Sequence, residues 1–63
     1  MTEKELLYLE DAALHEKSII SICQDMSLKL SSDNLGEFLN NQILEHQNIL
    51  DNLTNLLKEK ANE

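Results

Sequence analysis

A single cluster of turn-forming residues divides an otherwise helical sequence, and this feature constrains the fold more than any other. Residues 31–34 read Ser-Ser-Asp-Asn, while the 63 residues contain no proline and only one glycine. On both sides of the cluster, apolar residues recur at spacings of three and four, the period of an amphipathic helix. We therefore expect one domain over residues 1–63, an all-α antiparallel two-helix hairpin. Its helices should span about residues 3–31 and 35–60, with a turn at about 32–34.

Both expected helices begin with a capping signal. Thr2 and Glu5 frame the run Thr-Glu-Lys-Glu, a capping box in which the hydroxyl and the carboxylate each accept a hydrogen bond from a backbone N–H that lacks a helical partner. Asn34 is followed three residues later by Glu37, which predicts a second N-cap at Asn34. The two signals set the expected helix starts near residues 3 and 35.

The shortness of the chain predicts association. A domain of about 60 residues buries only about 60% of its unfolded surface, and small folds usually need disulfides, metals or partners. Cys23 is the only cysteine, so an intrachain disulfide is excluded. We expect a homodimer in which two hairpins form a four-helix bundle. The predicted interface residues follow the apolar stripe of each helix: Leu6, Leu9, Ala13, Ile20, Cys23, Leu30, Leu39, Gln42, Ile49, Leu53 and Leu56.

Polar residues interrupt the middle of both apolar stripes. Glu16 lies near the centre of the first stripe and His46 near the centre of the second, with Gln42 one turn before it. Counted from the turn, Glu16 and His46 lie within about one helical turn of the same level. One interpretation is a buried polar pair that fixes helix register, and another is a bound metal, because carboxylate and imidazole are ligands of iron and manganese. A third is that the helix phase differs from the one assumed.

The sequence around this pair resembles a known family. Glu16-Lys17 in the middle of the first helix, a short turn, and then the run Glu-His-Gln-Asn-Ile-Leu at residues 45–50 resemble the half-length ferritin-like hairpins of the spore coat protein F family. The similarity spans nearly the whole chain and rests on the overall pattern. It implies that the dimer is a ferritin-like four-helix bundle. It also implies a coat-like structural protein, with itself and other coat or scaffold proteins as partners.

The resemblance also implies where a metal would bind. The ferritin-like pattern places its first glutamate at Glu16 and the histidine of its Glu-x-x-His motif at His46, but the glutamate of that motif would fall on Ile43. A frame that starts the motif at Glu45 ends on Asn48 instead of histidine. One ligand per hairpin is missing, so the resemblance favours a degenerate core without catalysis or cofactor. The alternative is a bundle that binds iron or manganese, with Gln42 or Glu45 as a weak substitute ligand.

The charge balance disfavours anionic partners. The chain contains twelve Asp and Glu residues, five Lys and no Arg, which gives a formal net charge of −7. A negative charge of this size repels nucleic acids and anionic membranes. A hairpin dimer that binds RNA, of the Rop type, remains the rival from another class, although Lys4, Lys17, Lys29 and Tyr8 are dispersed among acids. Without a membrane-length apolar run or a basic leader, we expect a cytoplasmic protein, and the resemblance adds the spore coat.

A few residues fall outside the main stripes. Leu7, Leu14 and Leu28 project from the outer side of the first helix and could form a second contact surface. His15 lies at the edge of the first stripe, where we expect an exposed or rim residue. Cys23 is interpreted as a small hydrophobic residue, because no basic group nearby would activate its thiol.

Overall fold

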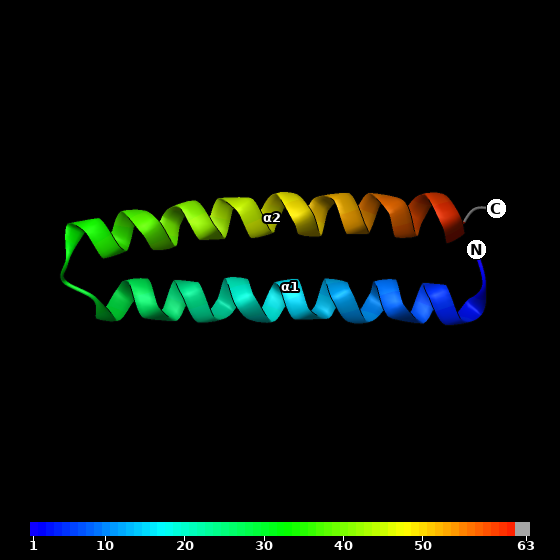
Figure 1. Ribbon diagram of the computed structural model, residues 1–63, viewed down its shortest axis with the longest axis horizontal. Helices are drawn as coiled ribbons and strands as arrows, with labels where there is room; N and C mark the ends of the chain where they lie inside the picture. The colour runs from blue at the N-terminus through cyan, green and yellow to red at the C-terminus, as the bar shows by residue number, and fades with distance from the viewer. Residues whose placement is uncertain (62–63) are drawn as a thin grey trace.

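The chain folds into two long antiparallel helices joined by a tight turn. The computed structural model describes residues 1–61, which form α1 (Glu3–Lys29) and α2 (Asp33–Ala61) and no strand. Figure 1 shows the helices lying side by side, with the turn at one end and both termini at the other. The all-α hairpin predicted from the sequence is confirmed. The last two residues of the predicted 1–63 unit lie outside the described residues.

The capping box at the start of α1 is confirmed. The backbone N–H of Glu5 donates to the Thr2 hydroxyl over 3.1 Å, and the backbone N–H of Thr2 donates to the Glu5 carboxylate over 2.8 Å. Two hydrogen bonds with Thr2 lower the pKa of Glu5 below its ordinary value. The bond with the Thr2 backbone has the larger effect, and the bond with the Thr2 side chain has the smaller one. The side chains of Thr2 and Glu5 thus each satisfy one backbone N–H at the helix terminus.

The turn lies about two residues earlier than the sequence predicted, and the N-cap expected at Asn34 is wrong. Leu30 already has an extended backbone (φ −94°, ψ 137°), so α1 ends at Lys29. The Ser32 carbonyl accepts from the Gly36 N–H over 2.9 Å, which continues the α2 pattern of hydrogen bonds back to residue 32. Ser32 therefore stands at the cap position, where serine is favoured as strongly as asparagine, and the negative charge of Asp33 suits the first turn.

The hairpin is long, thin and poor in buried residues. Its Cα atoms extend over 47 × 15 × 11 Å. Only Ala13, Ile20 and Leu39 are buried among the described hydrophobic residues. The accessible surface is 4941 Å², whereas a compact monomer of 7.2 kDa exposes about 4,100 Å². The excess, roughly 800 Å², reflects a two-helix layer with no second layer to cover it.

Candidate functional site

A hydrogen-bonded pair links the two helices at mid-length. Nδ1 of His46 in α2 lies within hydrogen-bonding distance of Oε2 of Glu16 in α1. An ionised carboxylate can only accept, so Nδ1–H donates, and Nε2 lies outside this bond. Both side chains are largely covered, with 22% of the His46 side chain and 15% of the Glu16 side chain exposed. The prediction that these two residues meet is confirmed.

This pair sets the register of the hairpin. Because the helices are antiparallel, residues equally far from Glu16 and His46 in opposite directions lie at the same level. Cys23 is thus level with Leu39, and Leu9 is level with Leu53. The predicted interface stripe is half-buried or buried at nine positions, and it forms the seam between α1 and α2. These are Leu6, Leu9, Ala13, Ile20, Cys23, Leu39, Gln42, Leu53 and Leu56, whereas Leu30 and Ile49 remain exposed.

The residues of one chain do not fit the iron or manganese site that the resemblance implies. Within residues 1–61, no group of three or more His, Cys, Asp or Glu side chains could hold a metal ion. Glu16 and His46 bind each other, Ile43 occupies the position of the missing glutamate, and Glu45 is exposed. Gln42 is half-buried one turn from His46 but is a neutral and weaker ligand. What one hairpin brings together among these candidate ligands is the Glu16–His46 pair.

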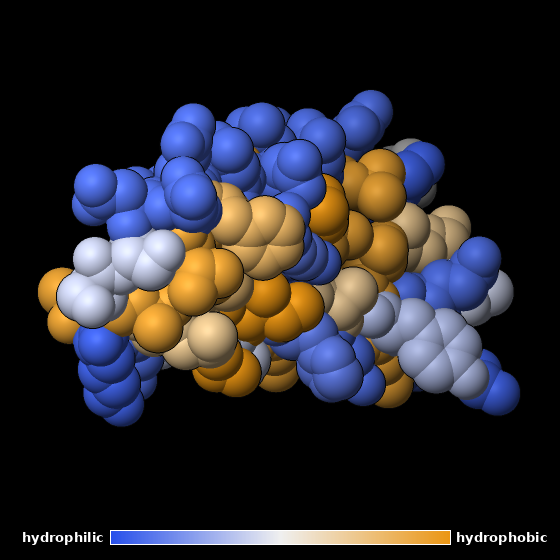
Figure 2. Space-filling view, turned by 60° about the vertical axis from the view of Figure 1, so that its left-hand side comes forward, coloured by the Kyte–Doolittle hydropathy of each residue, from blue (hydrophilic) through white to orange (hydrophobic). Residues whose placement is uncertain are grey.

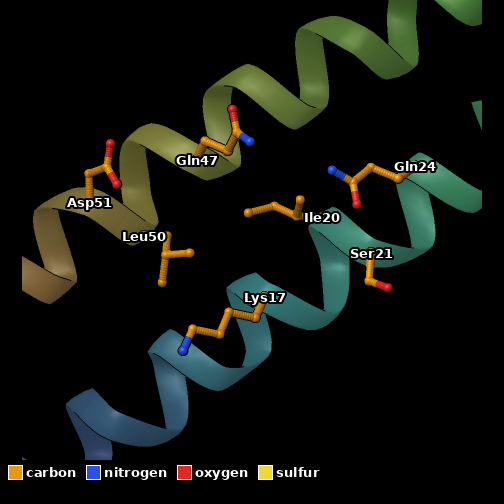
Figure 3. Close-up of a pocket in the computed structure, with 7 residues that line it drawn as sticks. All are labelled: Lys17, Ile20, Ser21, Gln24, Gln47, Leu50 and Asp51. Carbon is orange, nitrogen blue, oxygen red and sulfur yellow. The ribbon is translucent and has the colours of Figure 1, made fainter.

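One side of the hairpin carries a groove with a polar rim, which we call the groove face. Its volume is about 440 Å³. Figure 3 shows side chains of both helices around it, with Ile20 and Leu50 between the two ribbons. The remaining lining residues are Lys17, Ser21, Gln24, Gln47 and Asp51. Amides, a hydroxyl and two opposite charges suit contact with water.

The opposite side of the hairpin, which we call the apolar face, is different. At about 100° per residue from the seam, Lys17 and Gln24 turn toward the groove face, whereas Ile19 and Met26 turn the other way. Figure 2 shows a band of hydrophobic side chains running along the molecule between hydrophilic margins. By the same helical phase, seven residues belong to this face: Tyr8, Ile19, Ile22 and Met26 of α1, and Leu35, Phe38 and Ile49 of α2.

Most of these side chains are exposed, and of the seven only Ile49 was among the interface residues predicted from the sequence. Tyr8, Ile22 and Phe38 are between 57% and 61% exposed, while Ile19 is half-buried. The signal was present, because the residues at 8, 12, 15, 19, 22 and 26 alternate spacings of four and three beside the main stripe. A second row of apolar residues is hard to recognise in a sequence when the first row already explains why the helix forms.

Three further expectations concern His15, the three outer leucines of α1 and Cys23. His15 is exposed, as predicted. Leu7, Leu14 and Leu28 are exposed as well, and Leu28 is 85% accessible. These three leucines lie on the outer side of α1 toward the groove face, so they do not continue the apolar band. Cys23 is a half-buried free thiol in the seam, level with the buried Leu39.

Comparisons with known proteins give no family assignment. No protein-family model, curated protein or solved structure matches the chain. In the described part of the chain, neither helix contains a segment both long and apolar enough to cross a membrane.

Proposed function

We propose that this chain is a structural protein that acts by associating with further copies of itself into a helical bundle. The observation that carries the proposal is the imbalance between three buried hydrophobic residues and a large set of exposed ones. Contiguous exposed apolar surface marks an interaction site in a soluble protein. The large hydrophobic residues exposed in the single hairpin are Met1, Leu7, Tyr8, Leu14, Ile22, Met26, Leu28, Leu30, Leu35, Phe38, Leu44 and Ile49.

The shape of the hairpin supports the same proposal. The radius of gyration is 14.5 Å, whereas a compact domain of this length has a radius of about 10.6 Å. A two-helix layer buries one stripe per helix, and stable helical folds cover the remaining apolar surface with a second layer. A second copy of the hairpin supplies that layer without any lengthening of the chain.

Charge supports self-association over the RNA-binding alternative. With twelve acidic residues and five lysines, the chain would need a concentrated basic surface to hold a phosphate backbone. The Lys4 ammonium lies 5.9 Å from the centre of the Tyr8 ring, an arrangement typical of a cation–π contact at an exposed site. Lys17 belongs to the groove face, on the other side of α1 from Tyr8. Lys4 and Lys17 thus lie on different faces of α1 instead of on one basic surface.

The resemblance to the spore coat protein F family adds a biological setting to the proposal. In that setting the protein would be a coat-like component without turnover, and its polar pair would be the remnant of a ferritin-like core. An immunoblot across growth and sporulation of the parent organism tests this setting. Accumulation during sporulation supports it, and constant expression contradicts it while leaving self-association untouched.

Sedimentation equilibrium of the purified chain tests the proposal directly. At about 10 µM, where a standard-size interface is populated, we expect a dimer or larger species with the circular dichroism of two full helices. The melting temperature should rise with protein concentration, because association stabilises only the folded state. A folded monomer with a concentration-independent melting temperature would overturn the proposal.

A further inference from the structure

The apolar face has the size of a protein interface. A rectangle of 47 by 15 Å, the two longer extents of the hairpin, covers about 700 Å², close to the roughly 800 Å² that each partner buries in a stable complex. The accessible area that the single hairpin exposes beyond that of a compact monomer is about as large. One partner of the same width and length would therefore cover this face.

The arrangement of polar and apolar residues makes the apolar face complementary to itself. Ile22, Met26 and Phe38 lie on the turn side of the Glu16–His46 level, and Tyr8 and Ile49 lie on the other side. A two-fold axis places apolar residues against apolar residues and the polar level against itself, whether it runs parallel to the helices or crosses them at right angles at that level. Such a match between a surface and its own copy is what an isologous dimer requires.

One imidazole side chain and one carboxylate side chain lie at the margin of the apolar face. His15 precedes Glu16 in α1, and Glu45 precedes His46 in α2, so both lie close to the level of the polar pair. At about 100° per residue both turn toward the apolar face rather than the groove face. Both are exposed. An imidazole on one helix and a carboxylate on the other thus flank the face at its midpoint.

This placement distinguishes the two possible two-fold arrangements. An axis perpendicular to the helices stacks α1 on α1 and α2 on α2, which brings Glu45 against Glu45 of the partner subunit. An axis parallel to the helices stacks α1 on the α2 of the other copy, which brings each His15 against Glu45 of the partner subunit. Like charges that face each other destabilise an interface, whereas an imidazole N–H can donate to a carboxylate.

We propose that a second copy packs on the apolar face about an axis parallel to the helices. The two turns then lie at the same end, and His15 of each copy binds Glu45 of the partner subunit. The proposal rests on the self-association proposed above and adds its surface and orientation. The centre of the bundle becomes a Glu–His layer, with a Glu16–His46 bond inside each hairpin and a His15–Glu45 bond between hairpins. Each hairpin completes the layer of the other.

A spin-label distance measurement tests the orientation. In a Cys23→Ala background, Ser31→Cys places one label at the exposed turn of each copy. With the turns at the same end, helices packed 8–10 Å apart bring the labels within about 20 Å. With the turns at opposite ends, the separation approaches the 47 Å length of the hairpin. A dimer with the long distance leaves self-association standing and overturns this proposal, whereas a monomer overturns both.

Matched substitutions test the surface. Ile22→Gln with Phe38→Gln changes two side chains of the apolar face that are 58% and 57% exposed. Leu14→Gln with Leu44→Gln changes two side chains that are 58% and 61% exposed but lie off that face. The first pair should raise the dimer Kd about a hundredfold, and the second by less than about threefold. Equal effects of the two pairs would overturn the assignment of the face.

Charge reversal tests the contact between hairpins. Glu45→Lys should weaken the dimer about tenfold, because each His15 then faces a lysine ammonium of the other copy instead of the carboxylate that accepts its hydrogen bond. Glu37→Lys makes the same charge change at an exposed position on the outer side of α2 and should weaken it by no more than about twofold. If Glu37→Lys weakens the dimer as much as Glu45→Lys, the specific contact of Glu45 is excluded.

Discussion

His46 in α2 donates a hydrogen bond to Glu16 in α1, thirty positions away in the sequence and half way along the hairpin. Sliding α2 by one residue would rotate His46 out of the seam and leave Glu16 largely covered without a partner. A hydrophobic seam alone tolerates such shifts better, because apolar contacts have no direction. The polar pair therefore selects one register from several of similar hydrophobic burial.

This pairing predicts strong coupling between the two positions. Glu16→Ala or His46→Ala alone should lower the free energy of unfolding by about 1–3 kcal/mol, because each leaves a largely covered polar group without its partner. Glu16→Leu combined with His46→Leu should restore much of that loss, because both polar groups are then gone. Urea unfolding of the single and double variants, compared at one protein concentration, measures the coupling. Strictly additive effects would show that the pair does not act as a unit.

A second prediction concerns the only glycine. Gly36 lies in the first turn of α2 with an ordinary helical backbone, and a Cβ added there meets no atom within 4 Å. Alanine at this position restricts the unfolded chain without creating strain in the folded one. Gly36→Ala should raise the free energy of unfolding by about 0.5–1 kcal/mol, measured by urea unfolding. A decrease would mean that this position is covered more closely in the assembled protein than in the single hairpin.

The capping box predicts a local dependence on pH. The Thr2 hydrogen bonds hold the pKa of Glu5 below its ordinary value of 4.5. The folded state therefore binds this proton less readily than the unfolded state, and the stabilisation by Glu5 is present above pH 4.5. It is lost as the pH falls through the lowered value. Amide hydrogen exchange at Thr2 and Glu5 should accelerate, relative to the intrinsic rate, as the pH falls through this range.

Glu5→Gln is the matched control for that experiment, because the amide oxygen can accept the same hydrogen bond but does not titrate. Protection of the first turn in this variant should stay constant over the range in which the parent chain loses it. Equal loss in both chains would assign the change to other groups than Glu5.

The sequence was sufficient for the features that depend on local chemistry. The spacing of apolar residues determined the hairpin, the Thr2–Glu5 capping box was read directly, and the central positions of Glu16 and His46 placed them in one layer. The start of α2 was missed because Ser32 and Asn34 are both good N-caps, and the choice between them depends on how the turn closes. Apart from Ile49, the apolar face was missed because helical periodicity cannot say which of two neighbouring rows faces the second helix.

The last prediction follows from the charge of the chain. Each copy carries a formal net charge of −7, so two copies repel each other over distances that salt can screen, while the apolar face attracts at contact. Raising the ionic strength from about 0.05 M to about 0.5 M shortens the Debye length from about 14 Å to about 4 Å and should therefore tighten the dimer. Sedimentation equilibrium in sodium chloride at constant pH measures the Kd at each concentration. An interface built on attraction between charged surfaces would respond in the opposite direction, so weaker association at high salt would contradict the dominance of the apolar face.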